Sequence, residues 1–238
     1  MVLASHVIFC VYGFWLPNDP RGSWSDFVGA WELRRFGPAT KINTRRSVAA
    51  VRHDGEKRRL AKLALKYPPV YLNGVQARAV ARGFAEYVRK SSLVVWACSI
   101  LPQHVHMVIA RHDFHVEHVV NQLKGYATRR LSAEGFHPFA DVNGHARSCW
   151  ARGQWKVFLN SGSDVQGAVR YVRANPVKEG LAIQSYGFIC DRSFFQTTGM
   201  SEQSTTLAHL TRRRKVAGRG KSWPAHSHIA GRPSPRAP

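Results

Sequence analysis

The sequence predicts an α+β protein built on a four-stranded antiparallel sheet, with helices on one face of the sheet and one more helix after the last strand. Two observations predict this class. β-Prone apolar runs alternate with segments whose apolar residues recur every three or four positions, and the order is strand, helix, strand, strand, helix, strand. That order is the split βαβ pattern of the ferredoxin-like fold, and a further helix-compatible segment follows it.

Each predicted element has a local reason. Short runs rich in β-branched and aromatic residues predict strands at 6–14, 93–100, 104–110 and 156–159. Apolar spacing predicts helices at 73–90 and from Asp113 to about Leu131. The last helix is expected to begin at Asp164 as its N-cap and to stop near Pro176 and Gly180.

Two stretches fall outside this pattern. Residues 17–70 are rich in Pro, Gly, Trp and basic residues, and only 56–65 is helix-compatible, so this stretch is predicted to be a long insertion. Residues 201–238 are rich in Ser, Thr, Arg, Gly and Pro, which predicts a disordered basic tail that adds nonspecific affinity for nucleic acid. The main domain is therefore expected to span residues 1–200.

The charge of the chain indicates its class of partner. The 238 residues include 35 Lys and Arg against 14 Asp and Glu, for a formal charge of +21. Such an excess is typical of nucleic-acid binders, because phosphate contacts release counterions. An anionic membrane surface is the alternative partner. The sequence has no run of about 20 apolar residues, the length that is required to cross a bilayer. The four cysteines lack C-x-x-C spacing, so neither a zinc knuckle nor a disulfide framework is predicted, and a reducing cytoplasm fits.

A candidate metal site lies in the predicted strand 104–110. His104 and His106 are separated by one residue, and side chains alternate along a strand, so both rings point to the same face. A pair of imidazoles on one face is a ready pair of metal ligands. The same spacing also arises on the solvated face of a half-buried strand, so the pair requires a partner elsewhere in the chain.

The last predicted helix supplies that partner. Tyr171 and Asn175 are four residues apart and therefore share one helix face. A phenol with a pKa of about 10 is a poor nucleophile, and a divalent cation would help it by polarising the phosphate that it attacks. An amide oxygen is a ligand that such a cation accepts. The structural alternative is that Tyr171 packs at the edge of the core and Asn175 only ends a helix.

Three motifs resemble one family, the single-tyrosine HUH transposases, and most closely the REP-associated tyrosine transposases. The run Leu101-Pro102-Gln103-His104-Val105-His106 is similar to the histidine-hydrophobe-histidine motif of that family. The run from Tyr171 to Leu181 is similar to the nucleophile helix of the family and the turn that follows this helix. The run from Tyr12 to Gly22 is similar to the N-terminal segment of some members. The long segment 17–70 departs from the family.

The resemblance implies a function for each candidate residue. By this resemblance, His104, His106 and Asn175 would be ligands of Mg²⁺ or Mn²⁺, and Tyr171 would be the nucleophile. The implied reaction is cleavage and transfer of single-stranded, hairpin-bearing DNA through a 5′-phosphotyrosine intermediate, by a monomer or homodimer in the bacterial cytoplasm, at the nucleoid. The alternatives are a noncatalytic DNA-hairpin-binding protein on the same fold and a metal phosphodiesterase that uses water.

Cations and aromatic side chains supply candidate DNA contacts. The cations expected to be exposed on helices and to contact DNA are Lys124, Arg129, Arg130, Arg170, Arg173 and Lys178. Tyr126, on the predicted helix from Asp113 to about Leu131, is a rival nucleophile, but packing at the core edge is its expected role. Trp24, Trp31, Trp150 and Trp155 could stack on bases, although local packing is the expected role of each.

Overall fold

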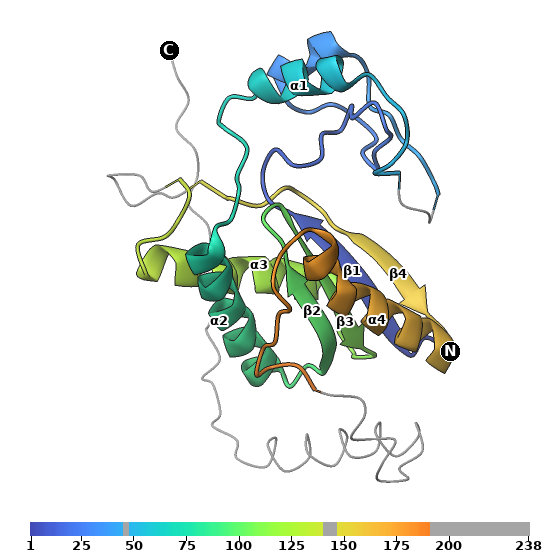
Figure 1. Cartoon of the computed structure of the whole chain (residues 1–238), viewed down its shortest axis with the longest axis vertical. Helices are drawn as coiled ribbons and strands as arrows, with labels where there is room; N and C mark the ends of the chain where they lie inside the picture. The colour runs from blue at the N-terminus through green and yellow to red at the C-terminus, as the bar shows by residue number, and fades with distance from the viewer. Residues whose placement is uncertain (45–47, 140–146, 191–238) are drawn as a thin grey trace, which may run out of the picture. The chain divides into compact units, whose positions relative to one another are not determined.

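The computed structural model describes residues 1–44, 48–139 and 147–190, so the predicted basic tail lies outside the described residues. Its sheet contains β1 (Ala4–Cys10), β2 (Val95–Ile100), β3 (His104–Ala110) and β4 (Trp155–Leu159), in the order β2-β3-β1-β4. Each neighbouring pair is antiparallel. The predicted fold class is therefore confirmed, with β1 and β3 as the central strands (Figure 1).

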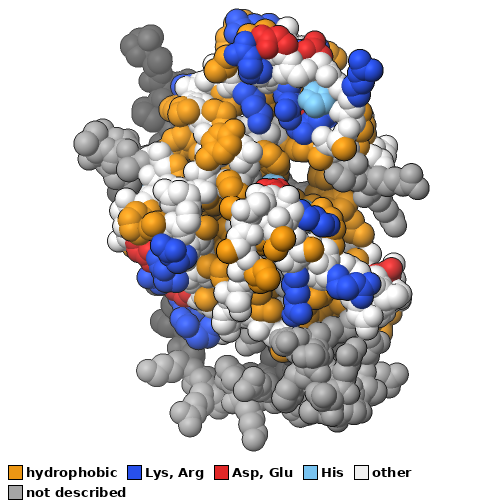
Figure 2. All heavy atoms as spheres, viewed as in Figure 1, with side chains coloured by type: hydrophobic (Ala, Val, Ile, Leu, Met, Phe, Trp, Pro, Cys, Tyr) orange, Lys and Arg blue, Asp and Glu red, His pale blue; other side chains and the backbone are white. Residues whose placement is uncertain are grey.

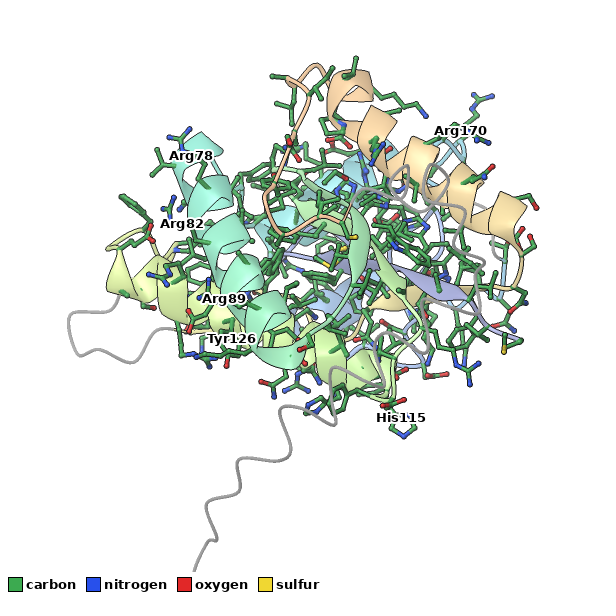
Figure 3. The ribbon with its side chains drawn as sticks, turned by 90° about the horizontal axis from the view of Figure 1, so that it is seen from below. Arg78, Arg82, Arg89, His115, Tyr126 and Arg170 are labelled. Atoms are coloured by element: carbon green, nitrogen blue, oxygen red, sulfur yellow. The ribbon has the colours of Figure 1, made fainter. Side chains whose placement is uncertain are left out.

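One face of the sheet carries the main core. Helices α2 (Gly74–Ser91) and α3 (Val116–Ala133) cover it, and their buried apolar side chains meet those of alternate strand residues such as Val7, Phe9 and Met107. The start of α2 is well defined, because Asn73 and Gln76 form a reciprocal capping box. Figure 3 shows α2 and α3 side by side, with Arg78, Arg82 and Arg89 extending from α2.

The two helices approach each other closely at Gly83. A Cβ atom at this position would lie 2.7 Å from the Cα atom of Ala127 and 2.7 Å from the carbonyl oxygen of Tyr126. Both are backbone atoms, which a side-chain rotation cannot remove. A glycine is therefore required where α2 crosses α3.

The opposite face of the sheet carries α4 (Gly162–Lys178). Val165, Val169 and Val172 of α4 pack on Ala4 and Val108 of the sheet in a second, smaller core. The predicted N-cap was wrong by three residues: Ser161 caps the helix, and the Asp164 carboxylate, at the third helical position, accepts a hydrogen bond from the Ser161 backbone N–H to complete a capping box. The helix also continues for two residues beyond Pro176 before it ends.

An inserted module, defined here as residues 14–69, replaces the short connection expected between β1 and α2. It contains the 3₁₀ helix η1 (Trp31–Phe36) and the helix α1 (Gly55–Leu63), which lie together at the top of Figure 1. A small cluster of Leu16, Leu33 and Ala61 packs between them. The prediction of a helix at 56–65 is thus confirmed with slightly shifted ends.

Buried polar side chains supplement the small apolar cluster of the inserted module. The Asn18 amide donates to the carbonyl oxygens of Leu33 at 2.8 Å and Gly37 at 3.3 Å. The Asp19 carboxylate is fully buried and accepts from Arg21 at 2.8 Å through both oxygens. Such bidentate, charge-assisted bonds fix the loop geometry strongly.

The inserted module leaves and rejoins the domain at one place. The backbone N–H of Val70 donates to the carbonyl oxygen of Tyr12 at 2.9 Å. Beside this bond, Gly13 has φ +79° and a Cβ there would meet Pro69 at 2.9 Å, so only glycine fits. Among the residues that the structure describes, no helix has the length and hydropathy required to span a membrane.

Candidate active site

Strand β3 places the two predicted histidines as expected. Val105, Met107 and Ile109 point into the main core, and His104, His106 and Val108 lie on the face that α4 covers. The His106 residue is only 4% exposed, and the side chain of His104 is 14% exposed. These rings are therefore not on a solvated strand face, which removes the structural alternative considered for the pair.

A third histidine joins them from β1. In the β1–β3 register Ile8 lies opposite His106, so His6, two residues away, points to the same face. Its Nε2 atom is 3.2 Å from His106 Nδ1, and the two rings stack at 5.4 Å between centroids. One nitrogen of this pair donates and the other accepts, so the contact fixes the orientation of the His106 ring and directs its Nε2 atom elsewhere. The sequence interpretation missed His6.

All three imidazoles are held neutral. Burial lowers the pKa of His6 and His104 to about 4 each. Burial, with the neighbouring His104 and His6, lowers the pKa of His106 further. At neutral pH each ring therefore keeps a nitrogen lone pair, which is the form that binds metal ions.

Helix α4 brings Tyr171 to the histidines. The Tyr171 ring centroid lies 5.6 Å from that of His106 and 5.9 Å from that of His6, both in edge-to-face geometry. Although it touches these buried rings, Tyr171 is 42% exposed. The Lys178 ammonium group lies 5.0 Å from the Tyr171 ring centroid. The phenol is therefore reachable by a large substrate from outside.

The last two turns of α4 add further polar atoms. Asn175 is 6% exposed, and its amide nitrogen has no hydrogen-bond partner among the described residues. Just after the helix, a carboxylate oxygen of Glu179 lies 3.8 Å from His104 Nε2, and burial raises the pKa of this carboxyl group. The sequence interpretation assigned no role to Glu179, because the turn it belongs to carries no local signal of contact with β3.

The donor set fits a divalent cation in part. The described residues contain no group of three or more His, Cys, Asp or Glu side chains arranged to hold a metal ion. The candidate ligands are therefore the neutral imidazoles of His104 and His106 and the buried amide of Asn175. The Nδ1 atom of His104 also has no hydrogen-bond partner among the described residues. Mixed nitrogen and oxygen donors of this kind suit a first-row divalent ion.

Comparison with known protein families gives one match. The family model described as "Transposase IS200 like" matches residues 63–175. This stretch is somewhat under half of the chain, and over it the chain is similar to IS200-like transposases. The match includes both strand histidines, Tyr171 and Asn175, and it excludes β1 and nearly all of the inserted module.

Two solved structures are similar to this chain at low identity. "Structure of the REP associates tyrosine transposase bound to a REP hairpin" is 14% identical, with a TM-score of 0.40, and the alignment covers 76% of this chain and 70% of that one. A putative transposase from Deinococcus radiodurans R1 is 14% identical, with a TM-score of 0.36, covering 76% of this chain and 93% of that one. No curated protein matches the chain.

Aromatic side chains of the inserted module and of β4 form the rim of the candidate site. Phe14 stacks on His104, with 4.9 Å between centroids and 2° between planes. Trp155, the first residue of β4, meets His6 edge-on at 5.7 Å, and Trp24 of the module stacks on Trp155 at 5.3 Å and 12°. The module thus contacts the sheet face that carries the three histidines.

The prediction that Lys124 is exposed was wrong. The residue is 8% exposed, and its ammonium group donates to the carbonyl oxygens of Ala151 at 2.9 Å and Gly153 at 2.6 Å. Burial lowers its pKa to about 8. Lys124 therefore holds the segment before β4 against α3, and its ammonium group is not available to DNA. The sequence interpretation placed Lys124 on the exposed surface because other basic residues lie on the same helix.

The other predicted DNA contacts divide into two groups. On α3, Arg129 lies over the Tyr126 ring at 4.1 Å, and Arg130 pairs with Glu86 at 3.2 Å and Glu134 at 3.8 Å. Tyr126 itself packs against Tyr87 at 5.3 Å, on the face of the sheet away from the histidines. The α3 cations therefore take part in local packing and ion pairs.

The cations of α4 flank the tyrosine. Arg170, Arg173 and Lys178 are all exposed, and they lie within seven positions of Tyr171 on the same helix. Figure 3 shows Arg170 extending outward from α4. On the face drawn in Figure 2, Lys and Arg side chains gather over α1 at the top and recur over the lower elements, with few acidic side chains between them. Contact of these cations with DNA stays a prediction.

Proposed function

We propose that this protein is a transposase, a metal-dependent single-stranded DNA endonuclease and strand transferase that acts on hairpin-bearing DNA through Tyr171. The observation that carries the proposal is the contact of an exposed tyrosine with two buried, neutral histidines. A tyrosine placed only for packing would be expected to bury its ring. Tyr171 instead keeps 42% of its surface accessible while its ring edge touches His106.

The covalent step is an in-line displacement at phosphorus. The Tyr171 oxygen forms a bond to the scissile phosphorus as the bond from phosphorus to the 3′ oxygen breaks. The phenol loses its proton and the departing 3′ oxygen gains one, which leaves a 5′-phosphotyrosine and a free 3′-hydroxyl. Because the new bond is again a phosphodiester, a 3′-hydroxyl can attack it in reverse and join strands without an external energy source.

The ligands proposed for Mg²⁺ or Mn²⁺ are His104, His106 and Asn175. Such an ion, when bound, supplies polarisation of the scissile phosphate. The protein's own contribution is orientation: β3 fixes both imidazoles on one face, His6 holds the His106 ring, and burial keeps the rings neutral. Helix α4 fixes Tyr171 and Asn175 one turn apart.

The charge of the chain supports the choice of substrate. A formal charge of +21 favours a polyanion, and exposed cations lie on the same helix as the nucleophile. The substrate that we propose for this chain is a hairpin next to single-stranded DNA; the REP-associated transposase compared above is bound to a REP hairpin. We expect this reaction to take place in the bacterial cytoplasm.

The decisive experiment is a search for a covalent protein–DNA adduct. Purified protein is incubated with labelled single-stranded hairpin DNA from the flanks of its gene, with and without Mn²⁺, and the products are separated in denaturant. We expect a Mn²⁺-dependent adduct that Tyr171→Phe abolishes. Tyr126→Phe is the matched control, since Tyr126 lies on the other face of the sheet.

The other outcomes identify the alternatives. Tight hairpin binding by the wild-type protein without an adduct would indicate a noncatalytic DNA-binding protein. Metal-dependent cleavage that survives in Tyr171→Phe would indicate a phosphodiesterase that uses water. Loss of the adduct in Tyr126→Phe but not in Tyr171→Phe would reassign the nucleophile.

A further inference from the structure

We infer that the stacked Trp24–Trp155 pair is a binding site for a nucleobase of the single-stranded DNA, next to the phosphate that Tyr171 attacks. This inference rests on the proposed function, because it names how the same site holds its substrate. The two indoles come from different parts of the chain: Trp155 begins β4, and Trp24 belongs to the inserted module.

The position of the pair relative to Tyr171 is the first argument. The Tyr171 ring lies 5.9 Å from the His6 ring, and the His6 ring lies 5.7 Å from the Trp155 ring. Trp155 faces the same side of the sheet as the histidines, since its β1 partner Ile8 is also the partner of His106. The tryptophan pair is therefore two ring contacts from the nucleophile, on the same surface.

The exposure of Trp24 is the second argument. Its indole stacks on Trp155 within 12° of parallel, yet Trp24 remains 45% exposed. A tryptophan that served only to join the inserted module to the sheet would gain most by burying its whole surface. A rigid indole with an accessible surface in a strongly basic protein is instead what single-stranded nucleic-acid binders use to stack bases.

The support beneath Trp24 is the third argument. Ser23, the preceding residue, is 4% exposed and pairs through its backbone with Thr40 at 2.7 Å and with Ile42 at 2.8 Å. The Trp15 indole donates to the carbonyl oxygen of Gly22 at 2.7 Å. The backbone on which Trp24 stands is therefore fixed before DNA arrives, so little conformational entropy is lost on binding.

The test compares DNA that has bases with DNA that lacks them. Binding is measured in metal-free buffer, where no cleavage is expected, to labelled 12-nucleotide oligo(dT) and to a 12-unit abasic strand of equal charge. For Trp24→Leu we expect affinity for oligo(dT) to fall by about ten-fold, within the range for loss of one stacked base, with unchanged affinity for the abasic strand. Trp24→Phe should retain most of the preference for bases.

Trp31→Leu is the matched control, because Trp31 belongs to the same module and is 80% exposed. A purely structural role for Trp24 would weaken binding of both strands equally and lower the free energy of unfolding, and that result overturns the inference. Unchanged oligo(dT) binding in Trp24→Leu, or a loss found only in Trp31→Leu, also overturns it. The two proposals can also fail separately. If the preference for oligo(dT) depends on Trp24 but the protein forms no adduct with hairpin DNA, the base site is supported and the proposed reaction is rejected.

Discussion

Replacement of Gly83 by Ala tests the close contact of α2 with α3. The added methyl group would lie 2.7 Å from two backbone atoms of α3. Because carbon atoms prefer about 3.5–4.0 Å, the helices would have to separate by roughly 1 Å. Overpacking of this kind costs about 1–3 kcal/mol, and the upper end, about 3 kcal/mol, applies here because only backbone can move.

A gain in helix propensity offsets part of that cost. Alanine is favoured over glycine in a helix interior by roughly 1 kcal/mol. We expect a net loss of about 2 kcal/mol in the free energy of unfolding, which corresponds to a fall in Tm of about 4–8 °C for a domain of this size. Urea and thermal unfolding followed by circular dichroism measure both quantities.

Gly125→Ala is the control for Gly83→Ala. A Cβ atom at Gly125, on α3, meets only the end of the flexible Arg129 side chain at 3.5 Å. This variant should gain about 0.5–1 kcal/mol from helix propensity alone. A Gly83→Ala protein as stable as the wild type would refute the backbone contact that we describe.

Three further outcomes are expected. Lys124 has a pKa of about 8 in the folded protein, below its value in the unfolded chain, so between these two pH values the folded protein binds fewer protons. The free energy of unfolding should therefore rise with pH above 8, by up to about 3 kcal/mol relative to the Lys124→Met variant. Urea-unfolding measurements in which the wild type and Lys124→Met depend on pH in the same way would contradict this. His6→Ala removes the hydrogen-bond partner of His106 and should weaken Mn²⁺ binding, measured by calorimetry, by about 10–100-fold. His6→Asn should restore part of the Mn²⁺ affinity. Equal Mn²⁺ affinities of the wild type and His6→Ala would argue against a role of His6 in orienting His106. Arg170→Ala should reduce the slope of log affinity against log salt for single-stranded DNA by about 0.7, whereas Arg82→Ala, whose side chain pairs with an α3 carboxylate, should not.

Local sequence patterns predicted the elements and half of the site. Period-two alternation placed β3 at its observed ends and assigned His104 and His106 to the correct face, because these features depend only on neighbouring residues. The spacing of Tyr171 and Asn175 followed in the same way from helix geometry. The N-cap of α4 was misplaced because Ser161 and Asp164 are both good caps, and only the reciprocal bond between them shows which one begins the helix.

Long-range pairing accounts for what was missed. His6 joins the site only through the register of β1 against β3, which links residues 100 positions apart. Lys124 is buried because the segment before β4 crosses it, and no pattern within α3 indicates that crossing. In the inserted module, buried polar contacts such as that of Asn18 with Leu33 determine the fold, so hydrophobic periodicity carries little information there.

The hydrogen bond between Val70 and Tyr12 has an evolutionary consequence. Because the chain departs from the sheet and returns at that bond, the length of the segment between these two residues can change without shifting the register of β1. Such changes in length then leave the positions of the strand that carries His6 and of the helix that carries Tyr171 unaltered. The inserted module, which carries Trp24, can therefore change in length and composition while His6 and Tyr171 keep their positions on the sheet and on α4.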